Sequence, residues 1–268
     1  MQKRTTLFSI VTVNLNNAQG LEKTIQSVIA QQYEDYEFVV VDGGSTDGSV
    51  DIIKKYQHKI TDWISEQDGG VYQAMNKGVN FAQGEWINFL NSGDCYCDNQ
   101  TLNTVANAIQ NIQVDFVYGD SCERIEGALV AHKQSNSIEE YWKDMFLCHQ
   151  TLFSRTKLMK KYPFRVANQL KVTADYDFVY RMIQDNHQFH KLSQLLTIQE
   201  VSGISSDTLA CLKGIYYVNR VNCKGLSLGR HYFYIKQLIM YFTQNNLILA
   251  LLIRSKQNIK HIYRFLFQ

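Results

Sequence analysis

Three aspartates in the first part of the chain stand at or near the ends of predicted strands, where α/β proteins bind their ligands. Asp42 ends the apolar run 38–41, Asp94 follows the apolar run 86–90, and Asp68 precedes a pair of glycines. In open α/β sheets, ligands bind beyond the carboxyl ends of the parallel strands. Carboxylates gathered there suit ribose hydroxyls and a hard divalent cation. These positions therefore predict a nucleotide site.

The segments that must position these side chains alternate between strand and helix patterns. Apolar runs predict strands at 7–15, 37–42, 62–65, 86–90 and 115–118, with amphipathic helices between them. Such alternation is typical of right-handed βαβ units around a parallel sheet. The second part predicts strands at 127–133, 150–155 and 189–201, a helix at 174–185, and helices only from residue 207. We therefore expect an α/β fold with a Rossmann-like, mostly parallel sheet flanked by helices.

The composition is that of a folded protein with room for one large domain and an appendage. Of 268 residues, 45% are hydrophobic and 19% are charged, and a single proline leaves no proline-rich hinge. The scattered cysteines fit a reducing cytosol, and the pair Cys95 and Cys97 lacks the second pair that a zinc site needs. The apolar run near the N-terminus is interpreted as the first strand rather than a leader, so a cytoplasmic protein is expected.

Charge is distributed unevenly along the chain. The net charge is +2, yet no Asp or Glu follows Asp207. The longest uninterrupted apolar stretch of the tail, 247–253, is far shorter than the roughly 20 residues that span a bilayer. We predict that residues 206–268 form a helical, basic tail lying on an anionic membrane surface. Its cations are Lys213, Arg220, Lys224, Arg230, Lys236, Arg254, Lys256, Lys260 and Arg264.

Two other arrangements of this tail stay open, a helix docked on the rest of the chain and a dimer interface. Nucleic acid also offers a negative surface. The basic residues, however, stand among long apolar stretches without a recognisable nucleic-acid-binding module. No nucleic-acid partner is therefore expected.

Four motifs occur in order along the chain, and two shorter ones follow them. They are Ser9–Asn16, Val41–Gly48, Asp68–Gly78 and Gly84–Asp94, then Cys148–Gln150 and Ala174–Asp177. On these motifs the chain resembles the family 2 glycosyltransferases with the GT-A fold, and in particular the branch that builds bacterial surface polysaccharides. The resemblance implies a catalytic domain at 1–205, with a nucleotide-sugar-binding half at 1–120 and an acceptor half at 121–205.

The resemblance also sets the expected reaction. It implies that a sugar moves, with inversion at its anomeric carbon, from a nucleotide-diphosphate sugar (most often a UDP-sugar) to a lipid-linked saccharide acceptor at the inner face of the cell membrane. An inverting transfer needs a carboxylate that takes the proton of the acceptor hydroxyl. Asp175, in the first turn of the predicted helix at 174–185, is the expected base. Asp177 is the next candidate, or the carboxylate that stabilises the helix N-terminus.

Asp94 is the expected ligand of a Mg²⁺ or Mn²⁺ cofactor. The family's pattern is Asp-x-Asp, whereas Asn91-Ser-Gly-Asp94 stands here, so one carboxylate remains and Asn91 can offer an amide oxygen. Such a cation can bind through one carboxylate together with substrate phosphates and water. The alternative is a turn aspartate in a Ser-Gly-Asp loop.

The resemblance further assigns contacts to the nucleotide-sugar, which are Asn14, Asn16, Asp42, Asp68, Asn76, Lys77 and Asn91. The alternatives are structural: a helix N-cap for Asp42, an Asx turn for Asp68, and a solvated side chain for Lys77. His149 and Gln150 are expected near the donor sugar or the acceptor. The family's frequent Pro-x-Tyr is missing, because Val13 and Leu15 stand in its place.

Two rival functions are weighed against a transferase. A dehydrogenase needs Gly-x-Gly-x-x-Gly after the first strand, where Asn14-Leu-Asn-Asn17 stands instead. A non-catalytic subunit that binds nucleotide-sugar or assists assembly stays open, because the metal motif is reduced to one carboxylate.

Overall fold

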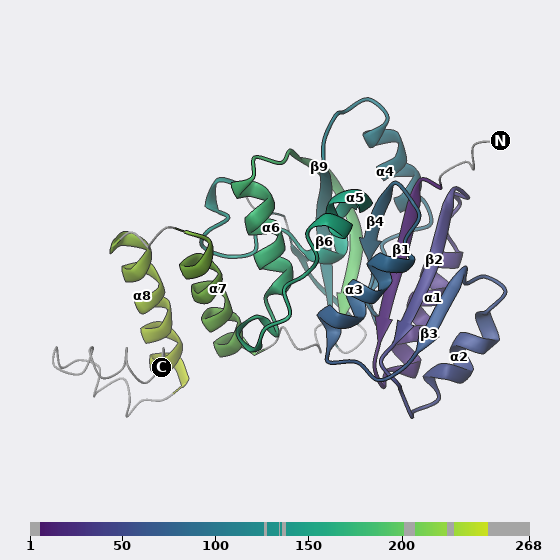
Figure 1. The fold of residues 1–268 in the computed structure, drawn as a ribbon, viewed down its shortest axis with the longest axis horizontal. Coiled ribbons are helices and arrows are strands. Elements are labelled where there is room, and N and C mark those ends of the chain that lie inside the picture. The colour runs from purple at the N-terminus through teal and green to yellow at the C-terminus, as the bar shows by residue number, and fades with distance from the viewer. Residues whose placement is uncertain are drawn as a thin grey trace.

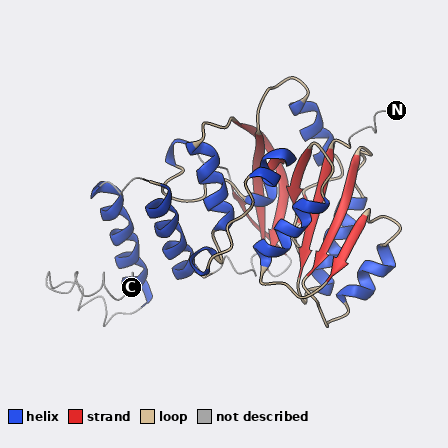
Figure 2. Cartoon of the chain, viewed as in Figure 1, coloured by secondary structure: helices blue, strands red, loops and turns tan. Residues whose placement is uncertain are grey.

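The chain is built around one mixed sheet with helices on both faces (Figure 2). The structure is a computed structural model that describes residues 6–125, 128–133, 135, 138–200, 207–223 and 228–245. Its first half supplies the parallel strands β1 (Phe8–Asn14), β2 (Tyr36–Asp42), β3 (Asp62–Ser65) and β4 (Trp86–Phe89). Helices α1 (Ala18–Ile29), α2 (Ser49–Tyr56) and α3 (Val71–Phe81) connect them. The predicted alternation of strand and helix is confirmed in this half.

The second half completes the same sheet with antiparallel as well as parallel pairs. It contains β5 (Cys95–Tyr96), β6 (Phe116–Ile125), β7 (Ala128–Lys133), β8 (Phe153–Arg155) and β9 (Phe189–Glu200). The strand order is β3-β2-β1-β4-β8-β6-β9-β5, and β7 pairs with β6. Strand β8 is antiparallel to both β4 and β6, whereas β6 and β9 are parallel. The sheet is thus parallel in its first half and mixed beyond β4.

Alternate residues of the central strands form two separate hydrophobic layers. Phe8 and Ile10 of β1 pack with residues of α1, α2 and α4 (Thr101–Ile109). Val11 and Val13 pack on the other face with α3, α5 (Thr156–Lys161) and α6 (Ala174–Gln184). Side chains alternate between the faces of a strand, so an uncharged run such as β1 can be buried on both sides. Gly78 brings α3 close to the sheet, since a Cβ there would lie 2.4 Å from Val11 Cγ1.

Several predicted boundaries need correction. The predicted strand at 150–155 begins as the 3-10 turn η2 (His149–Thr151), and only 153–155 is strand. Strand β5, helix α5 and the turns η1 (Ile138–Glu140) and η3 (Asn168–Leu170) are not anticipated. The N-cap of helix α2 is Gly48, whose backbone adopts the left-handed conformation with φ of 95°. Asp47 lies one residue before this N-cap, and its carboxylate accepts a hydrogen bond from the Ser49 amide.

The tail begins with two helices that dock on the rest of the chain (Figure 1). They are α7 (Thr208–Asn222) and α8 (Leu228–Asn245), which confirms the helices predicted from residue 207, while residues 246–268 lie outside the described part. Fully buried Asn219 joins the helices: its Nδ2 lies 3.0 Å from Tyr176 Oη on α6 and 2.6 Å from Tyr234 Oη on α8. Within the described ranges, no helix is both long and apolar enough to cross a membrane.

Substituting Gly214 with alanine tests the contact between α7 and α6. The new Cβ would lie 2.2 Å from Thr173 Oγ1, so we expect a loss of about 1–3 kcal/mol in the free energy of unfolding, measured by urea denaturation. Alanine otherwise stabilises a helix interior relative to glycine by about 1 kcal/mol. The double variant Gly214→Ala with Thr173→Ala should recover part of the loss. Wild-type stability in the single variant would contradict this packing.

Candidate active site

The ends of β1, β2 and β3 are tied together by the carboxylate of Asp42. The strand register places Asp42 beside Asn14 and Ser65. Its carboxylate has no exposed surface and accepts hydrogen bonds from Asn14 Nδ2 (2.7 Å), Ser45 Oγ (2.6 Å) and Ser65 Oγ (2.6 Å). Burial raises the pKa of Asp42, but these hydrogen bonds outweigh burial and hold it below the usual value. Asp42 is therefore a charged, fixed centre of this edge.

The loops after these strands carry the next predicted contacts. Asn16 adopts a left-handed backbone (φ 49°), and its Oδ1 accepts a hydrogen bond from the Thr46 amide (2.9 Å). Asp68 forms the Asx turn considered above, because its Oδ1 accepts from the Gly70 amide (2.8 Å). A Cβ on Gly43 would lie 3.0 Å from Asp68 Oδ2, so Asp68 stands directly beside the end of β2. Asn14, Asn16, Asp42 and Asp68 are thus brought together at one edge.

Asp94 lies in the loop after β4, with its carboxylate almost fully buried. It accepts hydrogen bonds from Gln150 Nε2 (2.9 Å) and from the Glu200 amide (3.2 Å). Burial raises the pKa of Asp94 to about 6, against the opposing effects of Gln150 and the nearby His149 ring. A bound cation would favour the ionised form of this carboxylate.

The residues around Asp94 fit a divalent cation that also binds substrate oxygens. Asn91 Oδ1 is buried and has no hydrogen-bond partner within the part of the chain that the structure describes, so a polar oxygen is available in the same loop. Among the described residues, no three His, Cys, Asp or Glu side chains gather as a metal cage. The chain therefore offers Asp94 and Asn91, and the remaining ligands would be phosphate oxygens and water, which is usual for Mg²⁺.

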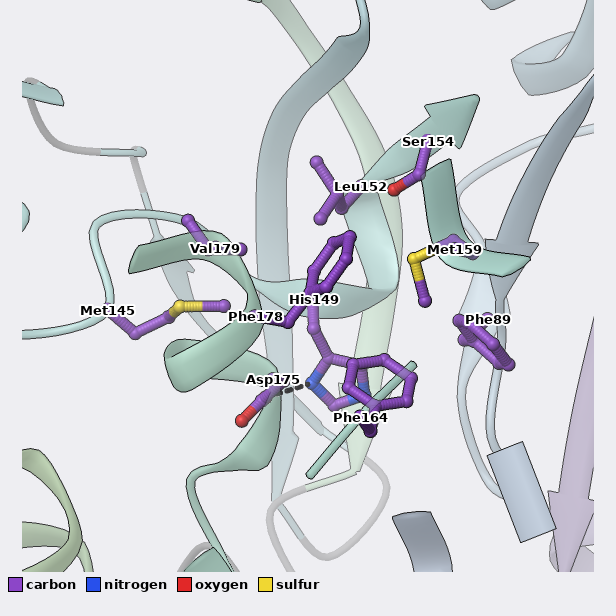
Figure 3. A pocket seen from close by; sticks show the side chains of 10 residues that line it. All are labelled: Phe89, Met145, His149, Leu152, Ser154, Met159, Phe164, Asp175, Phe178 and Val179. Atoms are coloured by element: carbon purple, nitrogen blue, oxygen red, sulfur yellow. Dashed lines mark ion pairs between the residues drawn. The ribbon is translucent and has the colours of Figure 1, made fainter. Parts of the chain in front are cut away.

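Asp175 and His149 face each other at a small apolar pocket between α6 and η2 (Figure 3). Their side chains are 17% and 25% exposed, and His149 Nδ1 lies 3.2 Å from Asp175 Oδ2. Burial alone would raise the pKa of Asp175, but the hydrogen bonds and charge of its neighbours, His149 first, hold it below the usual value. Burial lowers the pKa of His149, and Asp175 reverses that effect and raises it. Asp175 is thus an ionised, reachable carboxylate in the first turn of α6, as expected for a base.

Three other predicted site residues form hydrogen bonds or ion pairs with neighbouring residues of the protein. Both ends of the Asn76 amide bind the backbone of Phe164, at 2.9 Å each. Lys77 forms an ion pair with Glu66 at 2.8 Å. Asp177 has no exposed surface; it pairs with Arg181 (3.0 Å), and it also contacts Arg165 (3.3 Å) and Asn222 (2.9 Å).

Asn76 therefore anchors the segment before α6, and Asp177 forms ion pairs with Arg165 and Arg181. Asn76 and Asp177 stay predictions as site residues. Lys77 remains a prediction as a diphosphate contact.

One site residue has no predicted role. Tyr72, in the first turn of α3, donates its hydroxyl to Asp175 Oδ1 at 2.8 Å. It lies within the motif Asp68–Gly78, four residues after Asp68, so the motif itself carried the signal. A tyrosine at helical spacing among Val71, Met75 and Val79 otherwise resembles an ordinary core residue.

Two proteins of known family have sequences similar to this chain. The chain is 33% identical over 190 residues to the PGL/p-HBAD biosynthesis glycosyltransferase of Mycobacterium bovis, covering 65% of this chain and 69% of that protein. An uncharacterized glycosyltransferase of Haemophilus influenzae is 22% identical over 237 residues, covering 84% of this chain and 80% of that protein.

Solved structures share the fold. TarS residues 1–349 of S. aureus, in complex with UDP-GlcNAc, matches with a TM-score of 0.65 and 20% identity over 88% of this chain and 73% of that one. The mannosyltransferase PcManGT of Pyrobaculum calidifontis, in complex with GDP-Man and Mn²⁺, matches with a TM-score of 0.64 and 12% identity over 99% and 85%. The fold is therefore of the GT-A class. The model of the family described as Glycosyl transferase family 2 matches residues 9–185, and the chain belongs to that family.

The buried carboxylate of Asp42 predicts a pH-dependent stability. Asp42→Asn should lower the free energy of unfolding by about 1–3 kcal/mol at neutral pH, because part of the hydrogen-bonded charge is lost. Since the folded pKa of Asp42 is lowered, the wild-type advantage is present above the unfolded pKa and disappears as the pH falls through the folded pKa. Urea titrations from pH 7 down to pH 3 would measure it. A constant difference at all pH values would mean that the charge plays no part.

Proposed function

We propose that the chain is an inverting glycosyltransferase that moves a sugar from a nucleotide-diphosphate sugar, with a UDP-sugar as the proposed donor, to a lipid-linked saccharide in surface-polysaccharide synthesis. The observation that carries this proposal is the ionised Asp175 carboxylate, reachable from solvent and joined through η2 to the loop of Asp94. TarS is crystallised with UDP-GlcNAc and PcManGT with GDP-Man, which supports a nucleotide-sugar donor.

Each group has a distinct role in the proposed reaction. Asn14, Asn16, Asp42 and Asp68 surround the nucleotide end of the donor. Asp94 and Asn91 would hold Mg²⁺ or Mn²⁺, and the bound cation would supply positive charge to stabilise the leaving diphosphate. The acceptor oxygen attacks the anomeric carbon from the face opposite the diphosphate as the bond to the diphosphate breaks. The proton of the acceptor hydroxyl passes to Asp175.

A panel of nucleotide-sugars tests this function by release of nucleoside diphosphate, with membrane extract as the source of acceptor. Asp175→Asn should lower kcat about 10²–10⁴-fold, because the proton acceptor is lost. Asp94→Ala should lower release at limiting Mn²⁺. Asp185→Asn is the matched control, since Asp185 is an exposed carboxylate at the other end of the same helix.

The panel also separates the transferase from its rival. Binding of a donor without release or transfer, with every acceptor source, would favour a non-catalytic nucleotide-sugar-binding subunit. Release that survives in Asp175→Asn would move the base elsewhere.

We also propose that the tail helices lie on the inner face of the cell membrane, where a lipid-linked acceptor is held. Lys213, Arg220 and Val221 are exposed on one face of α7, and Lys236 and Met240 are exposed one turn apart on α8. Cations beside apolar side chains are what an anionic lipid surface attracts. No acidic residue follows Asp207 to oppose them.

Charge reversal tests this membrane contact. The double variant Lys213→Glu with Arg220→Glu should weaken binding to vesicles that contain an anionic lipid at least tenfold, because each cation contributes about 1 kcal/mol near such a surface. Lys54→Glu with Lys59→Glu is the control, because both lysines are exposed and Lys54 is on α2, which lies at the opposite end of the molecule from α7 and α8 (Figure 1). Equal vesicle binding by both double variants would mean that α7 and α8 stabilise the fold and do not contact the membrane.

A further inference from the structure

The turn η2 contacts both carboxylates that the proposed reaction uses. His149 reaches Asp175, and the next residue, Gln150, donates Nε2 to Asp94 Oδ2 at 2.9 Å. Asp175 is on α6 and Asp94 follows β4, so the two come from distant parts of the chain. Consecutive residues of one short turn therefore fix the distance between them.

This turn is itself held rigidly against the sheet. Asn88, fully buried in β4, donates Nδ2 to the carbonyl oxygens of Gln150 (2.9 Å) and Leu152 (3.0 Å). The Thr151 hydroxyl donates to the Cys148 carbonyl at 2.8 Å. The far side of the His149 ring is also engaged, because Asn91 Nδ2 lies 3.2 Å from Nε2. Because an amide nitrogen donates and does not accept, Nε2 is the acceptor in this contact. The ring proton is then on Nδ1, which donates it to Asp175.

The hydrogen bonds to Asp175 are unequal on its two oxygens. Oδ1 accepts from the Tyr72 hydroxyl (2.8 Å) and from the Tyr176 amide (2.8 Å), whereas Oδ2 contacts His149 alone among the side chains that the structure describes. Each carboxylate oxygen offers about two acceptor positions. Oδ1 is thus filled, and the remaining position toward a substrate proton is on Oδ2.

We propose that His149 and Gln150 are positioning residues of the transfer reaction: His149 aims Asp175 Oδ2 at the acceptor hydroxyl, and Gln150 orients the Asp94 carboxylate for the cation. This inference rests on the proposed function, because it assigns Asp175 as the base. It differs from the sequence-based expectation, in which both residues touch the donor or the acceptor. Partners of this kind that orient a reacting group are typically worth 10–100-fold in affinity or activity.

Two isosteric substitutions separate the nitrogen atoms of His149. Asparagine places its amide nitrogen where Nδ1 lies, and glutamine places it where Nε2 lies. We expect His149→Gln to lower kcat for transfer about 10–100-fold with an unchanged KM for the donor, and His149→Asn to recover most of that loss. His187→Gln is the matched control, since His187 makes a similar Nδ1 contact of 2.9 Å to Asp115, away from the site.

Gln150 has a different readout. Gln150→Met removes the donor to Asp94 without adding a charge, so Mn²⁺ binding in the presence of UDP, followed by electron paramagnetic resonance, should weaken about 10–100-fold. The Kd of UDP without metal should stay unchanged. Unaltered Mn²⁺ binding would overturn the role of Gln150.

The outcomes for His149 distinguish the inference from the function beneath it. Equal losses in His149→Asn and His149→Gln, or a rise in donor KM as large as the fall in kcat, would mean that the ring touches substrate. No loss in either variant would mean that Asp175 is oriented without it. Tyr72→Phe removes the other side-chain donor to Asp175 with little change of shape and should also lower kcat alone. A change confined to KM would mean that Tyr72 contacts the substrate and does not orient Asp175. Absence of transfer by the wild type would instead refute the proposed function.

Discussion

Burial of the Asp42 charge is the constraint on which this edge of the molecule depends. An ionised carboxylate is costly to remove from water unless hydrogen bonds replace its hydration. Here the donors come from β1, from the end of β3 and from the loop after β2, and they can do so only in the observed parallel register. Satisfying one charge therefore fixes the ends of three strands and the starts of the loops that follow them.

The second centre of the site is organised differently. Burial raises the pKa of Asp94, which favours its protonated form. His149 and Tyr72 hold the pKa of Asp175 below its usual value, which favours its ionised form. Two carboxylates in one site thus have opposite electrostatic environments. Pairs of groups whose pKa values are pushed apart are a common mark of divided chemical roles. The neutral side chains of Asn88 and Gln150 connect the two environments without adding a charge.

Much of the first half could be predicted from local sequence, because its strands are buried on both faces and its helices are amphipathic. The uncharged run at 7–15 matches β1, and the run ending at Asp42 matches β2. Strand β5 has two residues and β8 has three, and both exist because distant strands pair with them. No periodic pattern can form over such lengths, so β5 was not predicted, and β8 was predicted only as part of a longer strand at 150–155.

The same distinction applies to the site. Aspartates at strand ends and in the first turn of α6 could be found from position, since a strand end or a helix start is a local property. The partners of those aspartates could not. Asn76 is drawn to the Phe164 backbone, and Asp177 to Arg165 and Arg181, by contacts that only the folded chain creates. In the sequence, Tyr72 has the helical spacing of an ordinary core residue. Its contact to Asp175 arises only because the fold brings α3 next to α6.

The strand order has a consequence for how the protein is made. Strand β4 pairs with β1 on one side and with β8 on the other, and the residues of β8 are synthesised long after those of β4. Strand β5 likewise pairs with a strand that is synthesised much later, β9. While the ribosome is still extending the chain past residue 120, one edge of the β3-β2-β1-β4 layer is therefore unpaired and apolar. Open strand edges of this kind are sites of misassociation. The nascent chain can bury that edge only once β8 has emerged, so the two halves mature as a single unit rather than in succession.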